Sequence, residues 1–184
     1  PNSQTARCHY PLPKIEDLLM RHGRKHIFSI MDLRQAFHQQ PMEKGSRHIT
    51  STWIPKGVYQ WKVNIMGLTN AAQQFQRMME EVLEEVRDVA DPYIDDIIVG
   101  TEAQEGVDLI IQHEKDIRRV LDVLKKRFLV ADMRKCIFFV WEVEFCGHIL
   151  GKGKRRPAPG KLMAIEKWEV PTTISELRGF FGIH

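Results

Sequence analysis

The chain has 184 residues, and its 43% hydrophobic and 28% charged content is typical of a globular domain and excludes a chain that is disordered throughout. Its length suffices for one domain with a hydrophobic core, and no apolar run approaches the roughly 20 residues that would cross a bilayer. The net charge of +3 is unevenly spread, because residues 79–106 hold ten acids and one base, which leaves +12 elsewhere and favours a polyanionic partner.

The N-terminal part of the chain predicts a helix followed by a strand. Apolar residues recur at helical spacing between Ile15 and Leu19 and stop near Gly23, which predicts a short helix. Residues 26–33 form a β-prone run that carries one acid, Asp32. We therefore expect a buried strand with a single carboxylate near its end.

The middle of the chain predicts a hairpin and a longer helix. Residues 43–61 are polar, with turn signals at residues 55–57, and the alternation over residues 58–63 favours a hairpin. Thr69 and Asn70 are suited to cap a helix over residues 71–86.

The acidic stretch, residues 79–106, has two interpretations. Its carboxylates either line the solvated face of the preceding helix, which we favour for residues 80–85, or gather where a divalent metal binds. Asp91-Pro92 is expected to end the helix, and residues 93–99 form another β-prone run that contains two adjacent aspartates.

The remaining elements complete an α+β pattern. The periodicity predicts a helix over residues 105–126, short strands over 128–131, 137–141 and 143–149, a basic connector over 151–160, and further helices over 161–168 and 174–181. The central order of strand, helix, strand, helix, strand predicts a split βαβ arrangement, an antiparallel sheet backed by two helices.

The three cysteines indicate a reducing compartment. Cys8, Cys136 and Cys146 are odd in number and widely spaced, which argues against a disulfide framework. A zinc site formed by Cys136, Cys146 and His148 is an alternative, but its spacing matches no finger or ribbon, and buried thiols are the interpretation we favour.

Three aspartates occur beside apolar strand residues, where a carboxylate is costly. Asp32 interrupts one run, and Asp95 and Asp96 interrupt another. Unpaired carboxylates lose hydration there, and adjacent ones repel, so they need a cation. A hairpin turn alone also explains Asp95-Asp96. If the turn lies between them and Asp32 is on a neighbouring strand, the three form a site suited to two Mg²⁺ ions.

The context of these aspartates resembles one family. Tyr93-Ile94-Asp95-Asp96 resembles the Y-x-D-D signature of reverse transcriptases. Four other segments resemble family motifs in the same order, namely residues 28–39 (FSIMDLRQAFHQ), 67–71 (GLTNA) with Phe75-Gln76, 144–148 (EFCGH) and 168–182 (WEVPTTISELRGFFG). The similarity extends from residues 10–13 almost to the last residue, and is greatest to the gypsy-type long-terminal-repeat retrotransposons.

The resemblance implies site residues of three kinds. Asp32, Asp95 and Asp96 are the implied catalytic and metal-binding residues. The implied nucleotide-binding residues are Leu33, Phe37, which excludes a 2′-hydroxyl unless it is simply a core residue, and Met66. The implied template and primer contacts are Gly67, Gln76, Tyr93, Phe145, Gly147, His148, Lys154 and Arg155. The bases at 152–156 are equally explained as a solvated connector.

The resemblance also implies an activity and an architecture. A reverse transcriptase is an RNA-directed and DNA-directed DNA polymerase, a nucleotidyltransferase that adds deoxynucleotides to a primer 3′ end with two Mg²⁺ ions, or Mn²⁺. Implied partners are an RNA or DNA template with its primer, deoxynucleoside triphosphates, and ribonuclease H, integrase and protease domains of a polyprotein. Residues 1–150 would be the palm, with a fingers-like insertion at about 39–66, and residues 151–184 a connector and the start of the thumb.

Two other functions use the same residues. A domesticated or degenerate relative would bind nucleic acid or a protein partner without catalysis, and a metal-dependent nuclease would use the same acids but has no motif of its own here. The absence of a visible secretory signal, together with the resemblance, leads us to expect an intracellular location, cytoplasmic in a virus-like particle or nuclear.

Overall fold

The computed structural model describes residue 8, residues 10–160 and residue 173. The helices expected over residues 161–168 and 174–181, and nearly all of the thumb-like motif at 168–182, lie outside the described residues. Across the described part of the chain, no helix is both long enough and apolar enough to cross a membrane.

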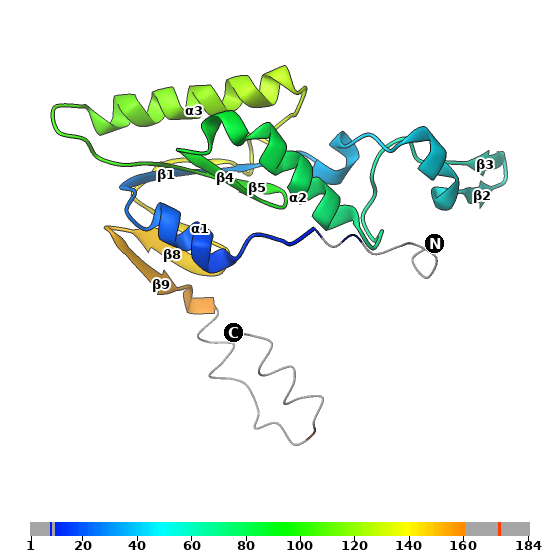
Figure 1. The fold of residues 1–184 in the computed structure, drawn as a ribbon, viewed down its shortest axis with the longest axis horizontal. Coiled ribbons are helices and arrows are strands. Elements are labelled where there is room, and N and C mark those ends of the chain that lie inside the picture. Colours follow the sequence, from blue (N-terminus) through cyan, green and yellow to red (C-terminus); the bar gives the residue numbers. More distant parts are fainter. Residues whose placement is uncertain (1–7, 9, 161–172, 174–184) are drawn as a thin grey trace.

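A four-stranded antiparallel sheet forms the centre of the fold (Figure 1). Its strands, in spatial order, are β4 (Ala90–Tyr93), β5 (Asp96–Thr101), β1 (Ile27–Asp32) and β6 (Ile137–Val140). Two helices, α2 (Ala71–Val82) and α3 (Leu109–Lys126), pack on one face through a shared core. The other face is covered by α1 (Ile15–His22) and a second sheet of β7 (Glu142–Phe145), β8 (His148–Gly151) and β9 (Lys154–Pro157). The predicted α+β arrangement, an antiparallel sheet backed by two helices, is confirmed.

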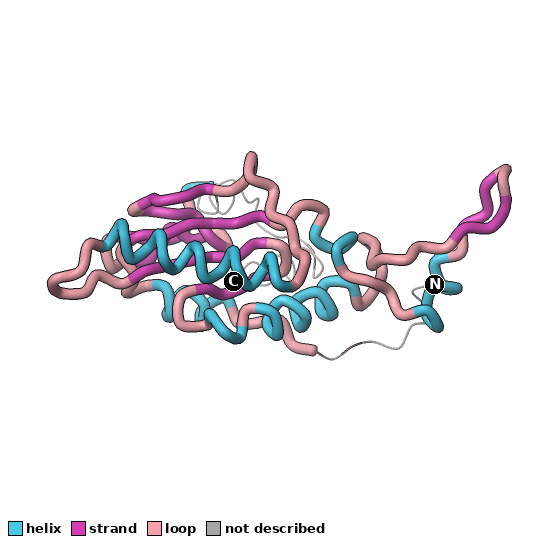
Figure 2. Tube along the Cα trace, turned by 90° about the horizontal axis from the view of Figure 1, so that it is seen from above, coloured by secondary structure: helices cyan, strands magenta, loops and turns pink. Residues whose placement is uncertain are grey.

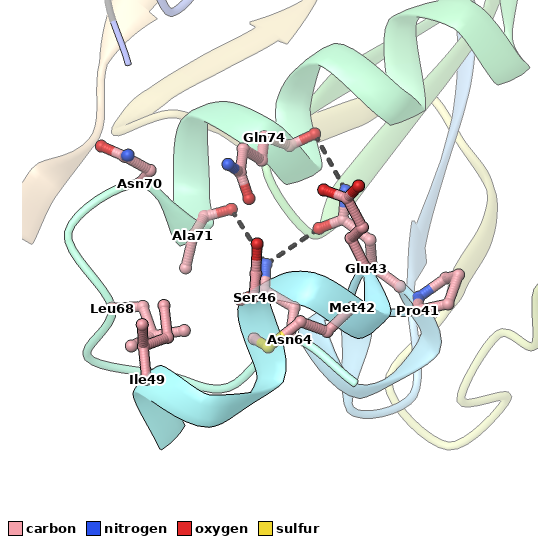
Figure 3. Close-up of a pocket in the computed structure, with 11 residues that line it drawn as sticks. Pro41, Met42, Glu43, Ser46, Ile49, Asn64, Leu68, Asn70, Ala71 and Gln74 are labelled. Carbon is pink, nitrogen blue, oxygen red and sulfur yellow. Dashed lines mark hydrogen bonds between the residues drawn. The ribbon is translucent and has the colours of Figure 1, made fainter. Parts of the chain in front are cut away.

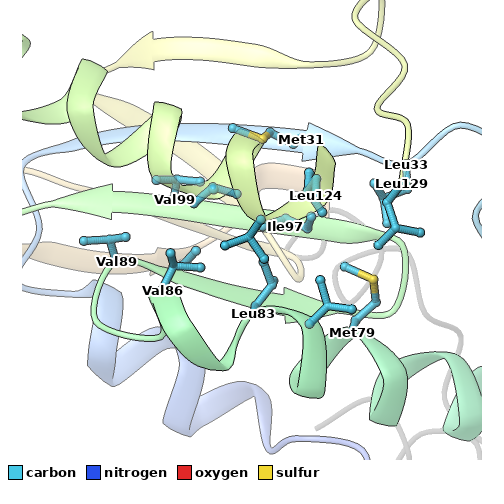
Figure 4. Close-up of a cluster of buried hydrophobic side chains, with 14 of the residues drawn as sticks. Met31, Leu33, Met79, Leu83, Val86, Val89, Ile97, Val99, Leu124 and Leu129 are labelled. Carbon is cyan, nitrogen blue, oxygen red and sulfur yellow. The ribbon is translucent and has the colours of Figure 1, made fainter. Parts of the chain in front are cut away.

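Strand β1 is buried on both faces because layers pack above and below it. Phe28 and Ile30 join the core on the α1 side, whereas Met31 joins the core beneath α2 and α3. Such a strand is apolar at consecutive positions. Figure 4 shows Met31 and Val99 of the sheet in the cluster that Leu124 of α3 completes. Asp32 follows directly, where β1 leaves the core.

The segment between α2 and β5 differs from the prediction. The α-helix ends at Val82 and a 3₁₀ turn, η4 (Glu84–Val86), follows it. Asp91-Pro92 does not break the helix, because both residues lie inside β4, an edge strand. An edge strand tolerates proline because its outer side needs no hydrogen-bond donor. The run predicted over residues 93–99 is therefore split between two strands.

Helix α3 begins later than predicted, at Leu109. The Asp108 carboxylate caps it by accepting hydrogen bonds from the N–H groups of Ile110 and Ile111. In this helix the apolar Ile110 is 53% exposed, whereas the polar His113 and Asp116 are buried. These polar side chains tolerate burial because they bond to Ser29 and Thr101 of the sheet, a possibility that apolar periodicity does not detect.

The C-terminal strands also differ from the prediction. Residues 128–131 form one isolated bridge, Leu33 to Ala131, in place of a strand. The run at 143–149 is two strands joined at Cys146-Gly147, where φ is 49° and 72°. The expected basic connector contains β9, because Gly153, at φ 67°, allows the chain to return along β8.

The fingers-like insertion projects from one end of the palm-like body (Figures 1 and 2). It contains the 3₁₀ helices η2 (Ala36–Gln39) and η3 (Lys44–Thr50) and the predicted hairpin of β2 (Thr52–Ile54) and β3 (Gly57–Tyr59). Its two ends meet as a short ribbon, in which Met42 N–H donates to Lys62 O and Asn64 N–H donates to Gln40 O.

Candidate active site

The backbone positions of the three aspartates are adjacent at one end of the main sheet. Strands β1 and β5 pair so that Asp32 lies directly opposite Asp96. Asp95 lies in the turn before β5, and its carbonyl accepts a hydrogen bond of 3.1 Å from Leu33 N–H. The expected turn between Asp95 and Asp96 lies one residue earlier, since Tyr93 pairs with Asp96 and the two turn residues are Ile94 and Asp95.

Negative charge accumulates among these carboxylates. Burial raises the pKa of Asp96 above its ordinary value, and the nearby charges of Asp95 and Asp32 raise it further, whereas Lys135 opposes them. Carboxylate oxygens are the donors that Mg²⁺ prefers, so the chemistry of the set fits this ion. Within the described residues, however, no three His, Cys, Asp or Glu side chains already converge as a metal-binding group.

Lys135 is the cation next to these acids. Its Nζ lies 3.2 and 3.3 Å from the two carboxylate oxygens of Asp32. The loop that carries it is attached to β1, because Asp132 N–H donates to Asp32 O at 2.8 Å and Lys135 N–H donates to Asp132 O at 2.9 Å. Sequence reasoning missed Lys135, which is 103 residues from Asp32 and belongs to no pattern of spacing.

Gln76 lies beneath the turn that carries Asp95. Its side chain is fully buried, and its Oε1 accepts a 2.6 Å hydrogen bond from Ile94 N–H. Its Nε2 donates to Pro92 O at 3.0 Å and to Glu80 Oε1 at 2.8 Å. The implied template contact is therefore not available to this side chain here. The signal in the sequence was a polar residue on an otherwise apolar helix face.

The three implied nucleotide-binding residues differ in exposure. Leu33 is buried, and Met66 is 72% exposed. Phe37 is half-buried, with its ring 5.4 Å from that of Phe75 at 59°, and packs against the main core. Phe37 thus belongs to the core while keeping part of its ring accessible, so the two readings of this residue are compatible.

The turn between β7 and β8 lies beside the aspartate turn. The rings of Tyr93 and Phe145 meet edge to face at 6.4 Å, and Phe145 is buried. Burial raises the pKa of the Cys146 thiol to about 12, with a smaller contribution from Asp96. Gly147 lies in the turn, and the side chain of His148, with its Nδ1 3.1 Å from Cys146 O, is part-buried.

Among the described residues, the cysteines form neither a disulfide nor a zinc site. All three are free thiols, which agrees with the argument against a disulfide framework. Cys136, Cys146 and His148 do not gather as a metal-binding group in the part that the structure describes.

Four exposed bases lie in the β8–β9 turn and on strand β9. Lys152 and Arg156 pair with Glu142 at 3.7 and 3.0 Å. Lys154 and Arg155 are exposed and form no ion pair with the described residues. These two therefore present unneutralised positive charge near the β7–β8 sheet.

A cavity of about 320 Å³ separates the fingers-like insertion from the start of α2 (Figure 3). A row of amides crosses one side of it. Asn64 Nδ2 donates to Gln40 Oε1 at 2.8 Å, and Gln40 Nε2 donates to Gln74 O at 3.2 Å. Both ends of the insertion are thereby attached to the helix that carries Gln76.

Comparison with known proteins gives consistent similarities. A family model described as reverse transcriptase (RNA-dependent DNA polymerase) matches residues 2–150. The chain is 34% identical over 183 residues to the retrovirus-related Pol polyprotein from transposon opus of Drosophila melanogaster, covering 99% of this chain and 18% of that protein. It is 30% identical over 187 residues to that from transposon gypsy of the same organism, covering 99% of this chain and 17% of the relative.

A solved structure shares the fold. The foamy viral protease-reverse transcriptase in complex with double-stranded DNA aligns with a TM-score of 0.83 and 21% identity, over 99% of this chain and 31% of that one. The antiparallel sheet with two backing helices is therefore a polymerase palm. The chain spans less than a fifth of the length of the two polyproteins.

Proposed function

The chain belongs to the reverse transcriptase (RNA-dependent DNA polymerase) family, and from this premise we propose that it is the catalytic palm of a retrotransposon RNA-directed DNA polymerase. The reaction adds a deoxynucleotide to a primer 3′ end on an RNA or DNA template. A bond forms between the 3′-oxygen and the α-phosphorus, and the bond between that phosphorus and the oxygen bridging to the β-phosphorus breaks. The 3′-hydroxyl proton passes to solvent, and pyrophosphate leaves.

The observation that carries the proposal is the pairing of Asp32 with Asp96 beside the turn that holds Asp95. These three carboxylates are the residues that would hold two Mg²⁺ ions, or Mn²⁺. When bound, the ions make the 3′-hydroxyl more acidic and stabilise charge on the leaving group. The pKa of Asp96 is raised by burial and then by Asp95 and Asp32, which supports a site whose negative charge a bound cation would stabilise.

The remaining assignments concern substrate positioning. Phe37 would limit space at the 2′ position of the incoming sugar, with Leu33 supporting the segment and Met66 next to the nucleotide. Gly67 and Tyr93 would contact template or primer. The β7–β8 turn with Gly147 and His148, supported by buried Phe145, would place the primer end, while Lys154 and Arg155 would neutralise phosphates. The DNA bound by the foamy viral relative supports a template–primer partner.

The proposed domain organisation follows from the same family. Residues 1–150 would be the palm, with a fingers-like insertion at about 39–66, and residues 151–184 would begin the thumb. Because the relatives are Pol polyproteins, we propose ribonuclease H, integrase and protease domains as partners, deoxynucleoside triphosphates as substrates, and an intracellular site of action.

Primer extension on an RNA template with Mg²⁺ tests the proposal. We would assay the chain alone and within a longer polyprotein of the kind its relatives have, each with Asp95 intact or as Asp95→Asn. Loss of the carboxylate is expected to abolish extension, because two-metal catalysis needs the full set of donors. Asp122→Asn, an exposed acid on α3, is the matched control and should extend normally. Equal extension by Asp95→Asn and the unmodified protein would remove the catalytic assignment.

A further inference from the structure

The β2–β3 hairpin and the residues after it expose three aromatic side chains. Trp53, Tyr59 and Trp61 are 82%, 53% and 46% exposed. Figure 2 shows this hairpin projecting away from the rest of the described chain. A lone two-stranded hairpin is marginally stable in water, and large exposed rings gathered in one place mark a contact surface. The sequence motifs of the active site do not include these residues.

The rings occupy more than one face of the hairpin. Trp53 pairs with Val58, so these two side chains share a face. Tyr59 pairs with Thr52 at the neighbouring position of the ladder and therefore lies on the opposite face. Trp61, beyond β3, stacks on His38 with ring centroids 5.6 Å apart and planes inclined by 20°. The Trp61 ring is thus supported on one side and open on the other.

The charge of this segment selects the chemistry of its partner. From Lys44 to Met79 the sequence contains no Asp or Glu but five Lys and Arg residues. Lys56, at the hairpin turn, and Lys62, beside Trp61, are exposed and form no ion pair with the described residues. A surface with rings, lysines and no carboxylate attracts phosphates and offers planes to bases, as in proteins that bind single strands.

The rings also continue outward from the proposed nucleotide site. His38, on which Trp61 stacks, directly follows Phe37 in η2. The Lys62 carbonyl accepts a hydrogen bond from Met42 N–H at the start of the insertion, and the chain then continues to Met66 and Gly67. Phe37 is thus next in sequence to the residue on which Trp61 stacks, which connects the proposed nucleotide site to the exposed rings.

We propose that the β2–β3 hairpin and Trp61 form a stacking surface for single-stranded nucleic acid. The identification of that strand as uncopied template rests on the proposed function, whereas the binding itself does not. Rings stack on any base, so binding is tolerant of sequence and of RNA or DNA. A protein partner would instead use Val58 as much as Trp53, since both share one exposed apolar face.

Fluorescence anisotropy with labelled oligothymidylate and oligouridylate tests the proposal, using the 184-residue chain in EDTA so that no reaction occurs. The oligonucleotides should exceed the site size of about 4–16 nucleotides that such surfaces occupy. Trp53→Ala and Tyr59→Ala are each expected to weaken binding by roughly 5- to 100-fold, because each removes a stacking plane. Trp53→Phe, which keeps a ring, should restore most of the affinity.

Val58→Ala is the matched control, because Val58 is exposed on the Trp53 face but has no ring. It should bind both oligonucleotides like the unmodified chain, and a blunt duplex should be insensitive to all the ring substitutions since its bases are already stacked. Lys56→Ala and Lys62→Ala should each reduce the slope of log affinity against log salt concentration by about the contribution of one phosphate contact. Circular dichroism confirms that each variant is folded.

Two results would overturn the proposal. One is equal oligonucleotide affinity for the unmodified chain and the ring variants. The other is a loss in Val58→Ala as large as that in Trp53→Ala, which would assign the face to a protein partner. A chain that binds single strands but extends no primer contradicts the proposed function alone. A chain that extends primers while its ring variants bind normally contradicts this inference alone.

Discussion

The Oε1 of Gln76 accepts the backbone N–H of Ile94 at 2.6 Å, which joins the centre of helix α2 to the turn before Asp95. Ile94 has φ 57°, a left-handed conformation that a β-branched residue rarely adopts. Such a conformation costs on the order of 1–3 kcal/mol and persists only where neighbours enforce it. Gln76, which also donates to Pro92 O, is that neighbour. A residue 18 positions earlier thus holds the Asp95 turn in place.

We predict that Gln76→Leu lowers the rate of primer extension by more than its loss of unfolding free energy alone would explain. The change leaves Ile94 N–H and Pro92 O without the partners seen here, which should cost about 1–3 kcal/mol of unfolding free energy. Ile94→Gly in the same protein removes the conformational strain at this position and should recover part of the extension rate. Thermal unfolding and single-turnover extension measure the two effects. If the extension rate and the stability fell in parallel both in Gln76→Leu and in the variant that also carries Ile94→Gly, a role of Gln76 specific to the turn would be contradicted.

We predict that Lys135→Met increases the affinity of the chain for a divalent ion. Lys135 Nζ pairs with both oxygens of Asp32, so a cation must compete with it there. Lys135 is 64% exposed, and pairs of this kind contribute about 0.2–1 kcal/mol, which corresponds to a gain of roughly 1.5- to 5-fold. Calorimetric titration with Mn²⁺ measures it. Arg134→Met, which breaks only the neighbouring pair with Asp132, is the control, and unchanged affinity in Lys135→Met would contradict the competition.

We predict that Asp96→Asn stabilises the chain at neutral pH in EDTA. Burial, then Asp95 and Asp32, raise the pKa of Asp96 in the folded protein above its ordinary 3.8. Between the two pKa values the folded state keeps a proton that the unfolded state has lost, so stability falls as pH rises through this window. Above it the penalty is constant, and below 3.8 it vanishes. The unfolding midpoint of Asp96→Asn should rise increasingly above that of the unmodified chain as pH increases through this range. A difference that is the same at every pH would contradict the role of the Asp96 charge.

A buried chain of hydrogen bonds leads to a prediction about acid stability. Thr101 Oγ1 gives its only hydrogen to Asp116, so it must accept from His113 Nδ1–H at 2.7 Å. In the neutral form of His113, Nε2 accepts the Ser29 hydroxyl at 2.8 Å, and Ser29 in turn accepts Phe139 N–H. The single ring proton of neutral His113 is therefore on Nδ1.

Burial lowers the pKa of His113 below its ordinary 6.5, an effect that the nearby Asp116 partly opposes. Below pH 6.5, His113 binds a proton in the unfolded state but stays neutral in the folded state. The free energy of unfolding should therefore decrease as pH falls from 6.5 to the lower pKa of the folded state. His113→Gln should lose this part of the acid sensitivity, whereas substitution of the exposed His48 should retain it. Calorimetric midpoints between pH about 7 and about 5 provide the measurement, and identical slopes in all three proteins would exclude His113 as the source.

Local pattern was a sound guide wherever the partner is near in sequence. The helix predicted from Ile15 begins there and ends at His22, and the hairpin turn at residues 55–57 joins β2 to β3. Local pattern failed where a distant partner changes the outcome. Pro92 belongs to a strand because that strand is at an edge, and His113 and Asp116 can be buried because Ser29 and Thr101 form hydrogen bonds with them.

The sequence by itself predicted the three aspartates of the proposed metal site, because motif order and costly carboxylates among apolar residues are visible along the chain. Only the tertiary structure decided that Asp32 faces Asp96, that Lys135 pairs with Asp32, and that Gln76 supports the turn. Periodicity and turn chemistry describe interactions over a few residues, whereas strand register and buried polar pairs are chosen by packing between segments far apart in sequence.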